Sequence, residues 1–350
     1  MRNIGRLQWL SEKLNCWATH IRTFLLILMN LSLLGIYVII LLPAFLQMAW
    51  FYVTTNRISV RYKNDSCRNT LDVYCFDPKS FPKGNNIQQN QPVVFFLPGG
   101  AYCLGYKMWG ALIAQALRPS GVIVVSADYR NYPFGKVPDM IQDGADALQW
   151  TIDHCHEYGG DQRRIVIVGQ SAGAHLGIMA LLLNQTTSDL SQNIRGFVGL
   201  SGIYDMQEAT NLFSRKLSLH PSVISEQLFS QHPDSCDPAV WLKLQTQRPF
   251  LPPIELWHGS SDTTIPWRVS HDFASLLEKY KYRVKFQLLP EWSHTDAILE
   301  AIFEGNHEFH QTLCQQVSTW CNQPLEFQTP DSSPCCFPIL VKLARKVSPF

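Results

Sequence analysis

The sequence carries almost no net charge and no basic stripe. Lys and Arg number 29 against 28 Asp and Glu in 350 residues, which gives a formal charge of +1. Proteins that bind nucleic acid present clustered Lys and Arg, often interleaved with aromatic side chains. Because no such cluster occurs and no internal repeat is visible, we expect no nucleic-acid partner and no repeat fold. The length suits one large catalytic domain with an appendage, or two modest domains.

Paired metal-binding cysteines are also missing. The ten Cys are scattered, and no C-x-x-C pair recurs at the spacing of a zinc site. Cys67 and Cys75 are a candidate bridge if the chain is lumenal, and unpaired thiols fit the composition equally well. We expect neither a metal nor a cofactor.

Charged residues and His are absent from Phe24 to Val53, a run of thirty residues. About 20 apolar residues cross the hydrocarbon core of a bilayer. Pro43 is expected to kink or end the span, and the aromatic residues near Trp50 suit the membrane interface. The run starts too late, is too long and lacks a small-x-small site for a cleaved signal peptide. We therefore predict a membrane anchor within residues 1–53, with its span at about residues 24–45 and membrane lipid as its partner. A buried soluble helix and a re-entrant hairpin are the alternatives.

The orientation of this anchor stays open. Four Lys or Arg residues precede the run and four follow it closely. The cytoplasmic side of a span usually has more Lys and Arg, and because the two numbers are equal here, they do not decide the orientation. Asn64 and Asn184 begin glycosylation sequons, but such triplets often arise by chance.

Residues 54–321 read as one α/β catalytic domain, because apolar strand patterns alternate with helical ones. Strands are expected at Ile58–Tyr62, Leu71–Phe76, Val93–Leu97, Gly121–Ser126, Ile165–Val168, Ile194–Leu200, Ile254–Trp257 and Arg283–Leu289. Helices are expected at Trp109–Leu117, Pro138–Tyr158, Ala174–Leu183 and Ala297–Trp320. This order predicts a mostly parallel central sheet flanked by helices.

The alternation fails between residues 203 and 252, where short helical pieces mix with many Pro. We interpret this region as a helical cap inserted over the carboxyl edge of the sheet. Its apolar residues, such as Phe213, Ile224 and Phe229, either floor a pocket or form the cap's own core, and the second interpretation is favoured. The Pro- and Ser-rich tail, residues 322–350, is expected to be poorly ordered.

The segment Arg164–Leu176 reads R-I-V-I-V-G-Q-S-A-G-A-H-L. A β-branched run enters Gly-x-Ser-x-Gly, and a helical pattern follows at once, which is the context of a nucleophile elbow. The Ser of an elbow lies on a strained turn and needs small neighbours, a need that Gly169 and Gly173 meet. The pentapeptide alone is common in loops, so this context supports Ser171 as the candidate nucleophile.

A Ser hydroxyl needs a base, and the base needs an acid that orients it. In an α/β sheet whose nucleophile lies on such an elbow, the acid and the base both follow the Ser in the sequence, in the order Ser, acid, His. His294 follows the last predicted strand and is the candidate base. His271, His307 and His310 lie in helical patterns and are expected at the surface.

Two further expectations concern the acid and another His. Asp262 follows the preceding strand and is the candidate acid, with a turn-forming role as its alternative. Asp296 is the rival, but it lies two residues from His294 and is expected to point elsewhere. His175 lies on the helix after the elbow and is interpreted as a packing or hydrogen-bonding residue.

The backbone N–H groups of Gly99, Gly100 and Ala172 are candidates for an oxyanion hole. The two glycines follow a predicted strand and let the backbone approach a substrate, whereas Ala172 opens the helix after Ser171. Such donors stabilise a developing oxyanion, and each contributes roughly 3 kcal/mol.

Together these pieces resemble the α/β-hydrolase fold and its branch with a hormone-sensitive-lipase-like Gly-Gly loop. More closely, they are similar to the plant-type isoprenylcysteine α-carbonyl methylesterases. The motifs that carry this resemblance are Pro98-Gly99-Gly100-Ala101-Tyr102, Gly105-Tyr106-Lys107-x-Trp109-Gly110, Asp128-Tyr129-Arg130-Asn131, Glu157-Tyr158-Gly159-Gly160-Asp161, Gly169-Gln170-Ser171-Ala172-Gly173-Ala174-His175 and His294-Thr295-Asp296. Tyr102 stands where that family is expected to have Trp.

The resemblance covers about residues 92–317 and implies hydrolysis of the methyl ester at a prenylated carboxyl-terminal cysteine. It also implies an amino-terminal membrane segment, and we expect an endoplasmic-reticulum or Golgi membrane location. A broad endoplasmic-reticulum carboxylesterase or deacetylase acting on lipophilic esters is the alternative. A catalytically silent scaffold with the same fold is less favoured, because all three positions of the triad are filled.

Overall fold

A single eight-stranded sheet organises the chain. The computed structural model describes residues 17–18, 21–22, 24–25, 28–29, 31–75, 90–183, 190–217, 220–229, 233–330 and 338–348. The strands run in the order β1-β2-β4-β3-β5-β6-β7-β8. Their bounds are β1 Ile58–Arg61, β2 Thr70–Tyr74, β3 Gln91–Leu97, β4 Ile123–Ala127, β5 Gly160–Gln170, β6 Ile194–Leu200, β7 Ile254–Gly259 and β8 Val284–Leu289. β2 pairs antiparallel with both β1 and β4, and all other neighbouring strands pair parallel, so the sheet is mostly parallel, as the sequence predicts.

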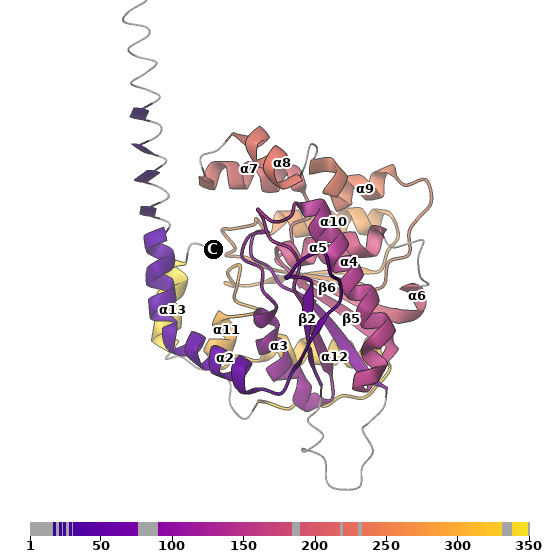
Figure 1. Cartoon of the computed structure of the whole chain (residues 1–350). Coiled ribbons are helices and arrows are strands. Elements are labelled where there is room, and N and C mark those ends of the chain that lie inside the picture. Colours follow the sequence, from indigo (N-terminus) through magenta and orange to yellow (C-terminus); the bar gives the residue numbers. More distant parts are fainter. Residues whose placement is uncertain are drawn as a thin grey trace, which may run out of the picture.

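Helices cover both faces of the sheet (Figure 1). Side chains alternate along a strand, so β3 sends Val93 and Phe95 to one face and Val94 and Phe96 to the other. The first face packs against α4, Val137–His154, α5, Ala172–Leu183, and α10, Arg268–Lys279. The second packs against α3, Gly110–Leu117, and α12, Glu308–Trp320. This burial on both faces explains why the central strands have almost continuous apolar sequences.

The final helix of the domain is interrupted, whereas the sequence predicts one helix over residues 297–320. The structure has α11, Glu300–Phe303, and α12 instead. Gly305 has a φ of +78° between them, and the Asn306 amide donates to the Ala301 carbonyl. A left-handed Gly followed by this hydrogen bond is a typical helix end.

The region predicted as a cap contains α7, Met206–Leu217, α8, Pro221–Phe229, and α9, Pro238–Leu244. These helices lie together at one end of the sheet (Figure 1). Ile224 and Phe229 are buried in the core cluster on the α5 face of the sheet. The apolar residues of this region therefore serve mainly to pack it onto the domain.

The N-terminal apolar run forms two helices with a break just before Pro43, where the sequence predicts that the span kinks or ends. Leu31–Ile40 and α2, Leu42–Thr54, meet at a bend of 70°. In the described part of the chain, no single helix is long and apolar enough to cross a membrane, and the two helices of this bent pair reach the length and composition of a span only when they are taken together. The helices run down one side of the domain, beside α13 (Figure 1).

The tail differs from the poorly ordered segment expected from residue 322 onward. α13, Pro338–Val347, is an amphipathic helix that buries Val341 and Ala344 in the core cluster of the α3 face. Its Arg345 guanidinium also pairs with Asp296 and Glu304. Hydropathy averaged over this short, basic stretch conceals its apolar face, which only the helical period reveals.

The structure also changes two expectations about individual side chains. His310 is fully buried in α12, which contradicts the surface position expected from its helical pattern. Cys67 and Cys75 are both free thiols, so they form no bridge.

Neither ring nitrogen of His310 has a hydrogen-bond partner among the described residues. Burial lowers the pKa of His310 to about 3, so the folded protein keeps this ring neutral. Between pH 6.5 and 3 the unfolded chain then binds a proton that the folded chain does not, and stability falls as the pH falls.

We predict that His310→Leu stabilises the protein more at pH 5 than at pH 8. At pH 8 the gain comes from removing an unpaired buried polar group, a change of about 1–3 kcal/mol. At pH 5 the removed ionisation adds roughly 2 kcal/mol. Thermal unfolding at the two pH values measures the difference. The neighbouring Phe309→Leu change is the control, since it removes no ionisable group, and an equal gain of His310→Leu at both pH values would contradict the prediction.

Candidate active site

Ser171 lies on the sharp turn between β5 and α5. Its φ is +53°, a left-handed value that is uncommon for a residue other than Gly. A Cβ on Gly173 would overlap with the Leu97 carbonyl oxygen, and one on Gly169 would approach the Ala174 Cα within 2.5 Å. Both glycines are therefore required by close packing, as the elbow pattern predicts.

The structure brings Ser171, His294 and Asp262 into one hydrogen-bonded row. His294 Nε2 lies 2.9 Å from Ser171 Oγ, and His294 Nδ1 lies 2.7 Å from Asp262 Oδ2. All three side chains are buried and come from loops at the carboxyl ends of β5, β7 and β8. This arrangement can take a proton from the Ser hydroxyl and stabilise the resulting imidazolium.

Asp262 contacts a second histidine that the sequence analysis did not foresee. His258 Nε2 lies 3.0 Å from Asp262 Oδ2 and 2.9 Å from the Ile265 carbonyl oxygen. A carbonyl oxygen only accepts, so Nε2 carries the proton and donates. His258 is the second-last residue of β7 and lies just beyond the strand predicted at Ile254–Trp257, and no motif in the sequence distinguishes it from a residue that only packs in the core.

The charge of Asp262 is held in place by its surroundings. Burial alone would raise the pKa of Asp262, but the charge of His294 and the hydrogen bonds from His258 and His294 outweigh it and keep this pKa well below its usual range. Asp262 Oδ1 also accepts the backbone N–H groups of Thr264 and Ile265, each at 2.8 Å. The carboxylate is therefore ionised and fixed in orientation.

The candidate oxyanion-hole residues lie beside this row. Gly100 has a φ of +130°, which an L side chain rarely adopts. Within the described part of the chain, neither the Gly100 amide nor the Ala172 amide donates to another protein group. Gly99 packs against Gln170, and Gln170 Nε2 donates to the His294 carbonyl at 3.3 Å. Gln170 thus ties the elbow to the loop of the base, a role that the sequence did not reveal.

His175 points away from the row and links two other segments. Its Nε2 lies 2.6 Å from the Cys236 carbonyl oxygen and its Nδ1 lies 3.0 Å from the Tyr102 hydroxyl. Burial lowers the pKa of His175 to about 4, so the ring is neutral, donates to Cys236 and accepts from Tyr102. It therefore joins the Gly99–Gly100 loop to the cap, consistent with the hydrogen-bonding role expected for it.

The rival acid, Asp296, is occupied elsewhere. Its Oδ2 accepts the Ser293 amide at 2.6 Å, and its Oδ1 pairs with Arg345. It does not contact His294 Nδ1, whose partner is Asp262.

A pocket of about 270 Å³ opens in front of Ser171. Its lining is almost entirely apolar and includes the glycine loop, the loop of His294 and two residues of the region predicted as a cap, Ile203 and Phe213. Four further lining residues come from the N-terminal helices: Leu34, Tyr37, Val38 and Phe45. An apolar pocket with a few polar groups at one end suits an ester whose bulk is apolar.

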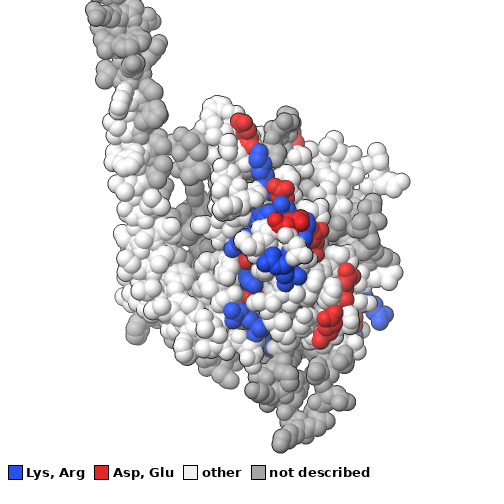
Figure 2. Space-filling view, in the orientation of Figure 1, with Lys and Arg blue, Asp and Glu red and all other residues white. Residues whose placement is uncertain are grey.

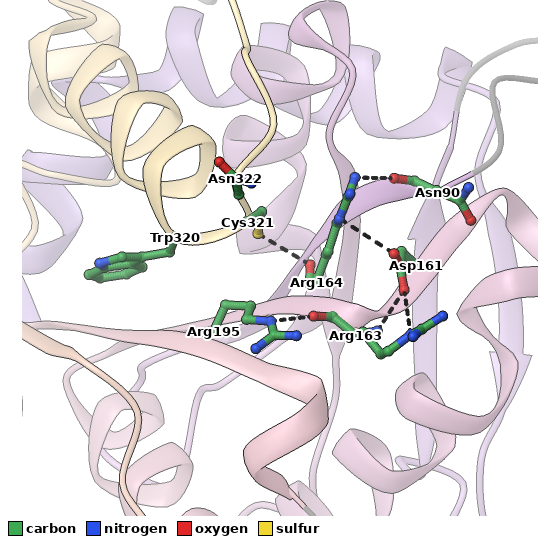
Figure 3. Close-up of a pocket in the computed structure, with 8 residues that line it drawn as sticks. All are labelled: Asn90, Asp161, Arg163, Arg164, Arg195, Trp320, Cys321 and Asn322. Carbon is green, nitrogen blue, oxygen red and sulfur yellow. Dashed lines mark hydrogen bonds and ion pairs between the residues drawn. The ribbon is translucent and has the colours of Figure 1, made fainter.

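A second pocket, of about 540 Å³, lies at the opposite edge of the sheet, by the amino ends of β5 and β6 (Figure 3). Here Arg164 contacts Asp161, the Asn90 carbonyl and Gln323, and so attaches the tail to β5. Burial raises the pKa of the Cys321 thiol to about 12, so it is not a nucleophile at neutral pH. The contacts of this pocket are structural.

No metal is suggested by the described residues, which contain no group of three or more His, Cys, Asp or Glu able to hold one. The chemistry that the geometry supports is acyl transfer through Ser171.

Comparison with known proteins finds relatives that are named as ester hydrolases. The BD-FAE family model matches residues 81–277. The isoprenylcysteine alpha-carbonyl methylesterase of Arabidopsis thaliana is 33% identical over 92% of this chain and 77% of its own length. A probable isoprenylcysteine alpha-carbonyl methylesterase of Oryza sativa subsp. japonica is 33% identical over 80% of this chain and 68% of its own. A thermophilic esterase from Thermogutta terrifontis superposes with a TM-score of 0.58 at 20% identity, over 75% of this chain and 91% of its own, and shows the same fold.

We predict that His258→Phe lowers kcat about tenfold. The change removes a charge-assisted hydrogen bond to Asp262, raises the pKa of that carboxyl and loosens the orientation of His294. KM should change little, because His258 is not among the residues that line the pocket.

Ser270→Ala is the matched control for this change. It removes the partner of His258 Nδ1, at 2.7 Å, and leaves the contact with Asp262 in place. Steady-state hydrolysis of p-nitrophenyl acetate measures both variants. Equal losses in the two would show that His258 acts only through packing.

Proposed function

This chain belongs to the isoprenylcysteine alpha-carbonyl methylesterase family and is a carboxylic-ester hydrolase. We propose that it hydrolyses the methyl ester of isoprenylated cysteine. The observation that carries the proposal is the row of Ser171, His294 and Asp262 beside an apolar pocket. The names of the relatives support the substrate, and the pocket supports its apolar character.

In the proposed mechanism Ser171 attacks the ester carbonyl while His294 takes its proton. Asp262 holds the His294 tautomer and stabilises the imidazolium. The amides of Gly99, Gly100 and Ala172 bind the oxyanion. His294 then protonates the departing methoxide, which leaves as methanol. A water molecule, activated by the same base, hydrolyses the acyl-enzyme to the free carboxylic acid and restores the Ser171 hydroxyl. The reaction uses no cofactor.

We further propose that the N-terminal helices anchor the enzyme in a membrane of the endoplasmic reticulum or Golgi. Residues 24–53 carry no charge, and the described part of this segment is a white column in Figure 2. Several of its large apolar side chains are exposed, among them Ile39 at 70% and Trp50 at 72%. Exposed apolar surface of this extent is costly in water and favourable in lipid. An anchored enzyme also meets a lipid-soluble ester at a higher local concentration.

A second candidate is a broad carboxylesterase or deacetylase of the endoplasmic reticulum that acts on lipophilic esters. The apolar pocket favours it as much as the first candidate, because nothing in the lining is specific to a prenyl chain. A catalytically silent scaffold has less support, since all three members of the row are present and in contact.

Ser171→Ala is predicted to abolish both ester hydrolysis and labelling by a fluorophosphonate, because it removes the nucleophilic hydroxyl. The change leaves the packing of the neighbouring side chains intact. The thermal midpoint should stay within a few degrees of that of the unaltered protein. Residual hydrolysis above one part in a thousand would rule out Ser171 as the nucleophile.

The unaltered protein is predicted to release methanol from a farnesylcysteine methyl ester at a higher kcat/KM than from an aliphatic methyl ester of equal length. The Ser171→Ala variant is the blank. Equal or lower values for the farnesyl compound would favour the broad esterase, and no turnover of any short p-nitrophenyl ester would favour the scaffold.

The orientation in the membrane separates the two enzymatic candidates. Asn64 is exposed in the turn between β1 and β2, and a lumenal domain would expose it to glycosylation. A prenylcysteine methylesterase acts on cytosolic substrates, so we predict that glycosidase leaves the mass of the expressed protein unchanged. A shift that Asn64→Gln abolishes would support the lumenal esterase instead.

A further inference from the structure

One wall of the pocket in front of Ser171 comes from outside the catalytic domain. Leu34, Tyr37 and Val38 lie at helical spacing on one face of the segment Leu31–Ile40, and all three line the pocket. Phe45, on α2, lines it beyond the bend. The N-terminal helices thus have a position in the site itself.

This wall is fixed to the loop that carries His294. The Tyr37 hydroxyl donates to Glu300 Oε1 at 2.6 Å, and the Thr295 hydroxyl donates to the same oxygen at 2.8 Å. Burial raises the pKa of Glu300, which favours the neutral acid and lets it lie among apolar neighbours.

Aromatic packing fixes the same wall beyond the bend. Phe45 packs edge-on against Trp109 and Phe303, with ring centroids 6.4 and 5.6 Å away. These contacts hold the wall in one place relative to Ser171.

The opposite face of the same segment is exposed and apolar. Ile39 is 70% exposed, whereas Tyr37 is buried and Leu34 is half-buried. Val38 lines the pocket and is still 39% exposed, so it lies at the rim between the pocket and the outer surface.

The volume of the pocket requires such an opening. Sites that enclose a drug-sized ligand have about 300–1,000 Å³, and this pocket has about 270 Å³. It can hold the ester group and the first part of a chain, and a longer chain has to leave it.

We propose that Leu34 and Val38 form the exit through which the long apolar chain of the acyl group passes from the pocket towards the lipid-facing surface. These two residues thereby set the chain-length preference of the enzyme. The inference rests on the proposed function for the nucleophile, Ser171, and deepens it by naming the residues that select the length of the apolar chain on the acyl part.

The test replaces each rim residue with Trp in the full-length chain in detergent micelles. Leu34→Trp and Val38→Trp are expected to lower kcat/KM for p-nitrophenyl decanoate at least tenfold more than they lower kcat/KM for p-nitrophenyl acetate. Ile39→Trp is the matched control, because it adds the same bulk to the exposed face of the same segment. It should change neither value.

Three results would overturn the proposal: equal losses for both esters, losses in Ile39→Trp that match those of Val38→Trp, or no loss of decanoate hydrolysis in either rim variant. If the Trp variants do not fold, Val38→Ala replaces them and is expected to raise the ratio of decanoate to acetate hydrolysis. An unchanged ratio in that variant would equally refute the exit.

Failure of the proposed function gives a different pattern. If Ser171→Ala retains hydrolysis of both p-nitrophenyl esters, the nucleophile is wrong. If farnesylcysteine methyl ester is inert while the decanoate effect of the rim variants persists, the exit stands and the prenyl substrate is wrong.

Discussion

The candidate site depends on one buried charge, the carboxylate of Asp262. A buried carboxylate is costly unless several groups compensate for its lost hydration. Here two histidines, His258 and His294, contact one oxygen, and the amides of Thr264 and Ile265 donate to the other. The same contacts that keep Asp262 ionised also fix the direction in which His294 faces. Stabilising the charge and orienting the base are therefore a single structural requirement.

Both ends of the chain converge on the loop that follows β8. Tyr37, near the N-terminus, and Thr295, within the loop, share one oxygen of Glu300. From the other end, Arg345 of α13 pairs with Asp296 in the same loop. The loop has no regular secondary structure of its own before α11, so these ion pairs and hydrogen bonds supply the rigidity that a catalytic base needs. The terminal segments thus contribute directly to the geometry of the site.

The fold and the row of three residues could be predicted because both follow from local patterns. Eight apolar runs gave the eight strands, and the position of Ser171, Asp262 and His294 after particular strands brought them to one edge of a parallel sheet. Contacts between distant segments could not be predicted in this way. His258 and Gln170 are ordinary residues in sequence, and only the folded chain shows that both support His294. Their catalytic roles, like that of Ser171, remain predictions.

The N-terminal segment shows a further limit of such patterns. A helix normally reveals its packing direction because one face is apolar and the other polar. The segment Leu31–Ile40 has apolar residues on both faces, with Tyr37 turned towards the pocket and Ile39 turned outward. Pro43 predicts a kink in this run, and the chain bends by 70° beside it, but the sequence does not reveal that one face then lies along the domain. One face of this helix lines the apolar pocket and the other faces the proposed lipid, and both surroundings favour apolar side chains. The helix therefore has no polar face, and its packing direction cannot be inferred from the sequence.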